Sequence, residues 1–183
     1  MQEISNDRGS ILLPVARAAI SCALNVPKTA DETAPWLSEM GASFVTLTQH
    51  GELRGCIGSL QAHRSLLDDV KRNAVSAALH DSRFIPLNAG ELPITKIEIS
   101  LLSPTHVMSF QSEADALAQL QPHVDGVVFE YRHYRSTFLP QVWEQLPQQG
   151  EFMAHLKHKA GLPVDFWSPE VKLSRYSVEK WQE

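Results

Sequence analysis

Two short segments that alternate apolar and polar residues, separated by a turn, constrain the fold of this chain most strongly. Residues 43–48 read Ser-Phe-Val-Thr-Leu-Thr, which is the pattern of a half-buried strand. His50-Gly51 then offers a turn, and residues 52–60 return as a second strand that contains two glycines. We therefore expect an antiparallel hairpin, with a bulge or bend near Cys56 where the glycines lie.

The remaining predicted elements alternate irregularly between helix and strand. Apolar spacing and capping residues predict helices over residues 10–24, 65–80, 112–120, 140–146 and 151–160, and strands over residues 94–102, 125–131, 136–139 and 171–178. The first helix tolerates Pro14 only if that residue lies in its first turn. Without a repeating strand–helix rhythm, the order favours an α/β (α+β) fold with a largely antiparallel sheet flanked by helices.

Composition sets the class of protein. A chain of 183 residues with 43% hydrophobic residues is the size of one domain, or of one domain with a small lobe, and it buries about 70% of its unfolded surface. The polar first ten residues do not resemble a signal peptide, and no run approaches the roughly 18 apolar residues of a membrane span. We expect a soluble cytoplasmic protein whose two cysteines are reduced.

Charge and histidine spacing argue against two function classes. The net charge of −5 disfavours broad nucleic-acid binding. Residues 132–135 make a small basic-aromatic patch, but no recognised nucleic-acid-binding module contains it, so a nucleic-acid modification factor is the weakest alternative. His155 and His158 share a helix face, but a zinc site needs three or four convergent ligands, and the other histidines are scattered. The sequence predicts no metal site, and it identifies no cofactor because it has no glycine-rich dinucleotide turn.

Residues 53–58, Leu-Arg-Gly-Cys-Ile-Gly, carry the first candidate site. Gly55 and Gly58 permit positive φ and close backbone approach, so the Cys56 thiol is predicted on a sharp bend with its sulfur exposed. The adjacent Arg54 would lower the thiol pKa or hold an anion. The structural alternative is a small buried residue on a bulge, with glycines required by the backbone.

Two further groups carry the same kind of ambiguity. Asp81 and Arg83, with Phe84, either present a guanidinium to an anionic ligand or form a cap and an ion pair that fix a loop. Glu98 lies on the polar face of the clearest strand. It serves as a general acid or base if that face lines a cleft, and it is otherwise solvated or paired across strands.

A last candidate group lies in the segment that follows the predicted strand near residue 136. Thr137, Phe138, Gln141 and Trp143 either form a cleft wall that offers a hydroxyl, an amide and an aromatic plate, or form a strand-to-helix corner in the core. The sequence favours neither interpretation.

Six ordered segments together resemble the AMMECR family, also called AmmeMemoRadiSam system protein A. They are residues 53–58, 81–87 (Asp-Ser-Arg-Phe-Ile-Pro-Leu), 98–104 (Glu-Ile-Ser-Leu-Leu-Ser-Pro), 125–128 (Asp-Gly-Val-Val), 137–143 (Thr-Phe-Leu-Pro-Gln-Val-Trp) and 159–163 (Lys-Ala-Gly-Leu-Pro), with Trp167 beyond. They keep the family order across roughly residues 10–180, and six ordered matches are a specific signal.

The resemblance implies that residues 1–183 form a single AMMECR-like domain. Its larger lobe would hold both termini, its smaller lobe would come from the middle of the chain, and a cleft would lie between them. It also implies association with a Memo-like protein and a radical SAM protein. It implies no reaction, and nothing in the sequence specifies an oligomeric state.

Two function hypotheses follow. The favoured one is a binding or adaptor component that docks a peptide or the Memo-like protein without breaking a bond. The alternative is an enzyme or group carrier that uses Cys56, with Arg54 and Glu98, in a cleft.

Overall fold

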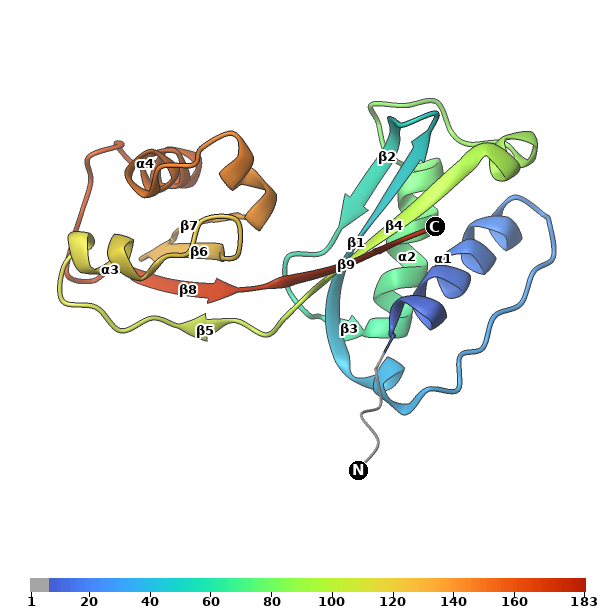
Figure 1. Cartoon of the computed structure of the whole chain (residues 1–183), viewed down its shortest axis with the longest axis horizontal. Helices are drawn as coiled ribbons and strands as arrows, with labels where there is room; N and C mark the ends of the chain where they lie inside the picture. The colour runs from blue at the N-terminus through green and yellow to red at the C-terminus, as the bar shows by residue number, and fades with distance from the viewer. Residues whose placement is uncertain (1–6) are drawn as a thin grey trace. The chain divides into compact units, whose positions relative to one another are not determined.

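The computed structural model describes residues 7–183, which form two compact units (Figure 1). The first unit comprises the described residues up to Leu102 together with Glu179–Glu183, and the second comprises Ser103–Val178. Both contain a sheet with antiparallel pairs and flanking helices, which confirms the predicted fold class. No helix in the described part of the chain has the length and apolar character needed to cross a membrane.

The first unit is a sheet with two helices on one face (Figure 1). Its strands run in the order β2-β1-β4-β9, and β3 pairs with the start of β1. The elements are α1 (Gly9–Ala23), η1 (Pro35–Ser38), β1 (Met40–Gln49), β2 (Glu52–Gly58), β3 (Arg64–Ser65), α2 (Leu66–Leu79), η2 (Ala89–Ile94), β4 (Thr95–Leu102) and β9 (Val178–Gln182), where η marks a 3-10 helix.

The hairpin prediction is confirmed, because β1 pairs antiparallel with β2 and also with β4. His50 and Gly51 both have positive φ, 52° and 83°, which is the backbone conformation of the tight hairpin turns that match strand twist. Alternate residues of β1 and β4 face the helices and form the core. They include Val45, Leu47, Ile97 and Ile99, all at most 1% exposed.

The helices of the first unit confirm one local prediction and correct another. Ser65 caps α2 as predicted, since its hydroxyl accepts a hydrogen bond from the Asp68 amide at 3.2 Å. Pro14, however, is the sixth residue of α1 and not a first-turn residue. Its missing amide leaves the Ser10 carbonyl without the usual helical partner. Because both residues are exposed, water can satisfy that carbonyl.

The second unit has its own sheet and core. The strand order is β5-β8-β6-β7, and its apolar core is centred on Phe129, Trp143, Phe152, Leu156 and Leu173. The elements are β5 (His106–Val107), α3 (Glu113–Gln119), β6 (Gly126–Tyr131), β7 (Tyr134–Phe138), η3 (Pro140–Glu144), α4 (Gln149–Ala160) and β8 (Lys172–Tyr176).

Two predicted elements of this region take another form. The strand predicted over residues 171–178 is two strands, β8 and β9, which belong to different sheets and are separated at Ser177. The helix predicted over residues 140–146 is the short 3-10 helix η3.

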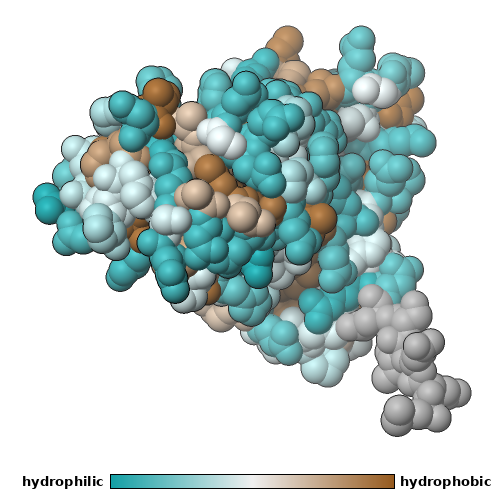
Figure 2. Space-filling view, turned by 60° about the vertical axis from the view of Figure 1, so that its left-hand side comes forward, coloured by the Kyte–Doolittle hydropathy of each residue, from teal (hydrophilic) through white to brown (hydrophobic). Residues whose placement is uncertain are grey.

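Figure 2 shows a face of the molecule on which hydrophilic residues predominate and hydrophobic residues form small groups.

Candidate functional site

A row of polar side chains crosses the face of the first sheet that the helices leave open. Thr46 of β1 lies opposite Cys56 of β2 on one side and opposite Glu98 of β4 on the other. Directly opposed residues of a sheet share a face, so these three side chains point the same way. The Thr46 hydroxyl lies 3.3 Å from the Cys56 Sγ, and Glu98 stands two strands from the thiol, about 10 Å away.

The backbone of Cys56 is held from the outer side of the sheet. Because β2 is an edge strand, the amide and carbonyl of Cys56 have no strand to pair with on that side. The Asp81 carboxylate accepts a hydrogen bond from the Cys56 amide at 2.9 Å, and the Arg83 guanidinium donates one to the Cys56 carbonyl at 3.2 Å. Asp81 and Arg83, which we call the edge clasp, thus take the place of a neighbouring strand.

The edge clasp is a tight ion pair. The Arg83 Nη2 lies 2.7 Å from Asp81 Oδ2 and its Nε lies 2.9 Å from Oδ1, while the Arg83 amide binds Oδ1 at 3.2 Å. The hydrogen bonds from Arg83 and then from the Cys56 amide hold the pKa of Asp81 well below its usual range. The Asp81 hydrogen bonds raise the pKa of Arg83, with a smaller contribution from the nearby Cys56 thiol.

Arg54 is turned away from this group by a β-bulge. Gly55 lies opposite Leu47 and Leu53 lies opposite Thr48, so Arg54 is the extra residue of the bulge. Its guanidinium pairs with Glu91 of η2 at 3.1 Å.

Besides Arg54, Glu91 accepts hydrogen bonds from Gln49 and from the Asn88 amide. Burial raises the pKa of Glu91, but hydrogen bonds from the Asn88 amide, Gln49 and Arg54 outweigh burial and leave that pKa below its ordinary value. The structure therefore gives Arg54 a carboxylate partner from η2 in place of the predicted partnership with the thiol.

The two glycines serve close packing, not a bend with positive φ. Among described glycines only Gly51 and Gly161 have positive φ, so the predicted conformational reason for Gly55 and Gly58 is wrong. A Cβ at Gly55 would lie 2.1 Å from the Ala77 carbonyl oxygen, and one at Gly58 would lie 2.2 Å from the Phe44 ring. Gly55 lets α2 approach the sheet, and Gly58 makes room for an aromatic ring on the open face.

The loop of residues 81–87, which contains the edge clasp, is fixed at both ends. The buried Asp81 begins it, and Leu87, which is 3% exposed, ends it with a hydrogen bond from its amide to the Ala78 carbonyl at 2.8 Å. Between these anchors the Arg83 guanidinium lies over the Phe84 ring at 5.4 Å. Ile85 at the tip is 82% exposed.

The candidates in the second unit divide between core and surface. Trp143 is fully buried, stacks on Phe152 at 3.7 Å and donates its indole N–H to the Asp125 carbonyl at 2.7 Å, so it is a core residue and not an exposed plate. Thr137 lies 3.1 Å from the Tyr176 hydroxyl. Burial raises the pKa of Tyr176, while the Thr137 hydrogen bond lowers it by less.

Two other candidates of that unit lie nearer its surface. Phe138 is half-buried, packs edge-on against Phe152 at 5.3 Å, and lies beneath the Lys159 ammonium at 5.1 Å. Gln141 is exposed. The predicted candidates thus fall into two sets: Arg54, Cys56, Asp81, Arg83, Phe84 and Glu98 belong to the first unit, while Thr137, Phe138, Gln141 and Trp143 belong to the second.

Comparison with known proteins identifies the family. The AMMECR1 family model matches residues 13–181. The chain belongs to the AMMECR1 family. It is 37% identical to a protein of Methanococcus aeolicus, over 98% of this chain and 92% of the relative, and 34% identical to one of Methanothermobacter thermautotrophicus, over 98% and 96%.

The AMMECR1 fold is also similar to a solved structure. The crystal structure of an uncharacterized protein from Pyrococcus horikoshii matches with a TM-score of 0.80 and 30% identity, and the match covers 98% of this chain and 93% of that chain.

Sequence reasoning missed Thr46 and a buried polar cluster of this AMMECR1 chain. Asp69 is 1% exposed and accepts hydrogen bonds from the Ser43 amide and hydroxyl at 2.8 Å, from the Ser59 hydroxyl at 2.6 Å and from Asn73 at 3.0 Å. The i, i+4 spacing of Asp69 and Asn73 inside the apolar stripe of the helix was the available signal. For Thr46, the signal was its position in the predicted hairpin.

The same AMMECR1 chain offers no cluster of metal ligands within residues 7–183, where no three His, Cys, Asp or Glu side chains converge. What the first unit does assemble is a thiol, a hydroxyl and a carboxylate on one sheet face, with a fixed ion pair at its edge. Such a surface can recognise a partner by shape, hydrogen bonds and charge.

Proposed function

We propose that this protein is a binding and adaptor component that acts with a Memo-like protein and a radical SAM protein. The observation that carries the proposal is the fixed loop of residues 81–87, which holds Ile85 82% exposed next to the half-exposed Arg83. An exposed aliphatic side chain and an arginine on a rigid support are suited to the centre of a protein interface. Since the loop is already ordered, binding costs less conformational entropy.

The arrangement of charges favours binding over catalysis. Both Asp81 oxygens accept hydrogen bonds, and the low pKa of this carboxyl keeps it ionised, so it is unsuited to proton transfer. Glu98 lies two strands from the thiol and pairs with Lys180 at 3.9 Å. Among the hydrogen bonds of the described residues, Cys56 Sγ has the Thr46 hydroxyl as its partner and no basic group.

A binding measurement with a matched control tests the proposal. The Memo-like protein and the radical SAM protein of the same genome are titrated into the purified chain by calorimetry. Ile85→Ser should weaken binding of one of them by at least about tenfold, which is the effect of a hot-spot residue. Val107→Ser is the control, because Val107 is 78% exposed but lies in the second unit.

Two outcomes would contradict the adaptor proposal. Absence of binding to either protein would remove the partners. Binding that Val107→Ser weakens as much as Ile85→Ser would remove the loop as the docking site. Circular dichroism of both variants confirms that the fold is retained.

The second candidate is a group carrier or enzyme that uses Cys56. Two features favour it: the Thr46 hydroxyl donates a hydrogen bond to the Cys56 Sγ at 3.3 Å, and the Arg83 guanidinium binds the carbonyl of the same residue. Reactive cysteines lie beside such donors and cations. Its test is the rate of Cys56 alkylation as a function of pH. A midpoint near that of a free thiol, about 8.5, in a protein whose partner binding survives Cys56→Ser, would exclude it.

A further inference from the structure

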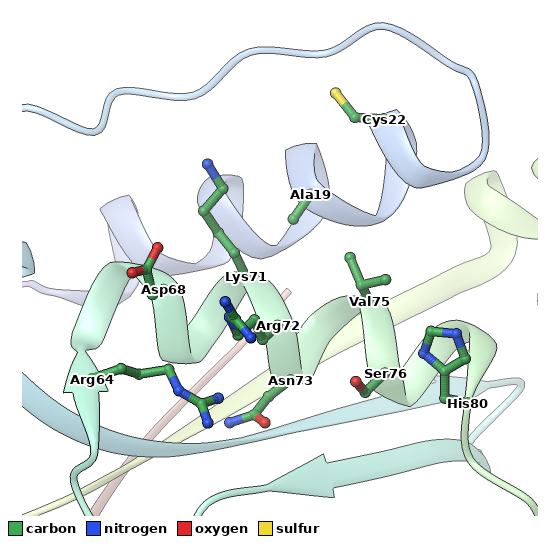
Figure 3. A pocket seen from close by; sticks show the side chains of 10 residues that line it. All are labelled: Ala19, Cys22, Arg64, Asp68, Lys71, Arg72, Asn73, Val75, Ser76 and His80. Carbon is green, nitrogen blue, oxygen red and sulfur yellow. The ribbon is translucent and has the colours of Figure 1, made fainter.

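A groove on the outer surface of the two helices carries cationic side chains that the proposed docking site does not use (Figure 3). Its volume is about 640 Å³, and its lining comes from α1, β3, α2 and the residue that follows α2. Arg64 comes from β3, near the start of α2, Lys71 and Arg72 are neighbours in the middle of α2, and His80 directly follows the helix. A groove of this size is in the range of small-molecule sites.

The charge of the groove is opposite in sign to that of the chain. Three of its lining residues are arginine or lysine, and Asp68 is its one acidic residue, whereas the whole chain has a net charge of −5. Arg72 is exposed and makes no ion pair or hydrogen bond with any residue from 7 to 183. Its guanidinium is therefore available to a ligand without breaking an existing contact.

The other two cations are only loosely held. Lys71 pairs with Glu32 at 2.9 Å, but both side chains are more than a third exposed, and such a pair contributes little to stability. Arg64 approaches Asp69 at 3.7 Å, but that carboxylate already accepts its closer hydrogen bonds from other groups. Both side chains can therefore turn toward an anion at small cost.

The remaining lining defines the body of the ligand. Ala19 of α1 and Val75 of α2 give the groove an apolar part, and Ser76 also lines the groove, on the other side of α2. Guanidinium groups match the geometry of phosphate oxygens and bind them through paired hydrogen bonds. We infer that this groove binds a small organic phosphate, whose charged group contacts Arg72 and Arg64 and whose apolar body lies against Val75 and Ala19.

A polyanion fits the observations less well than a small phosphate. RNA or DNA binding requires a basic face that neutralises many phosphates, and the net charge of −5 opposes a long nucleic acid outside the groove. The three cations Arg64, Lys71 and Arg72 line one groove. This small number suits a ligand with a single phosphate better than a nucleic acid, whose backbone carries many phosphates.

Calorimetry with adenosine 5′-monophosphate as the probe tests the inference at low salt. The unmodified chain should bind the nucleotide and should bind adenosine far more weakly. Arg72→Gln should weaken nucleotide binding by about tenfold or more, the loss expected for a charge-assisted hydrogen bond. Lys96→Gln is the control, since it removes one exposed positive charge of the same unit outside the groove and should leave binding unchanged.

Alkylation of the two cysteines gives a second readout on the unmodified protein. Cys22 is exposed and lines the groove, whereas Cys56 lies on the sheet. Adenosine 5′-monophosphate should slow the reaction of Cys22 with iodoacetamide, measured by mass spectrometry, and leave that of Cys56 unchanged. The inference is overturned if millimolar nucleotide neither binds nor protects Cys22, if Arg72→Gln has no effect, or if RNA binds more tightly with a steep salt dependence.

Discussion

Removal of the Asp81 carboxylate should destabilise the first unit by a defined amount. In Asp81→Ala the Cys56 amide loses an acceptor at 2.9 Å, and no strand replaces it because β2 is at the edge of the sheet. A hydrogen bond to a charged group contributes about 1.5–3 kcal/mol, and the contribution of Arg83 is small because its side chain is 55% exposed. The expected loss in the free energy of unfolding is about 2–3 kcal/mol. Asp81→Asn retains an acceptor and should lose about half as much.

The same carboxylate gives the loss a pH dependence of known sign. The pKa of Asp81 is lower in the folded chain than its ordinary value of about 3.9. A depressed pKa stabilises the fold fully above the unfolded value, and that stabilisation is lost as the pH falls toward the folded value. The difference between the unmodified chain and Asp81→Asn should therefore be complete above about pH 5 and smaller by roughly 1 kcal/mol at pH 3.

Urea unfolding followed by hydrogen exchange mass spectrometry measures this effect for each unit separately. Peptides of the first unit should lose protection at lower urea in Asp81→Ala, and peptides of the second unit should serve as the internal reference. A loss below about 0.5 kcal/mol in Asp81→Ala, or a difference for Asp81→Asn that is as large at pH 3 as at pH 7, would refute the edge clasp as the support of Cys56.

Two further predictions concern packing. Gly55→Ala should lower the free energy of unfolding in urea by about 2–3 kcal/mol, because its Cβ would lie 2.1 Å from the Ala77 carbonyl oxygen. Gly51→Ala is the comparison: Gly51 has a φ of 83° and no atom within 4 Å of the added Cβ, so the loss should be about 1 kcal/mol. Equal losses in the two variants would contradict the packing argument. Trp143→Phe should lower the thermal midpoint through loss of the 2.7 Å hydrogen bond to the Asp125 carbonyl, at about 2 kcal/mol, and an unchanged midpoint would show that this bond does not support the core.

The sequence predicted the local elements of the fold because their determinants are local. The hairpin depends on alternation and on the turn at Gly51, and the start of α2 depends on the hydroxyl of Ser65, and both are confirmed. The division of residues 171–178 between two sheets had no such signal. Those residues keep an extended backbone on both sides of Ser177, and only the strands that they pair with distinguish β8 from β9.

The candidate site was harder to predict because side-chain direction depends on register. The prediction that Arg54 acts on the thiol rested on the closeness of the two residues in the sequence. The bulge predicted near Cys56 is confirmed, but it makes Arg54 the extra residue and lets it reach Glu91. A shift of one residue reverses the face of a side chain, and the glycines of residues 53–58 indicate a bulge without specifying which residue is the extra one. Asp81 and Arg83 contact Cys56 through its backbone atoms, whatever its side chain is.

The backbone and the side chain of Cys56 have different partners, so they contribute separately to stability and to recognition. Its amide and carbonyl are bound by the edge clasp, so the clasp would hold the strand in the same way with serine at this position. Its sulfur, by contrast, faces the open side of the sheet beside Thr46. Cys56→Ser should therefore change the free energy of unfolding of the first unit by less than about 1 kcal/mol relative to the unmodified chain. If this variant binds a partner more weakly while its fold is retained, the loss of affinity comes from the thiol itself. If the variant instead unfolds at much lower urea, the thiol is a packing residue, and the open face is not available for recognition through its sulfur.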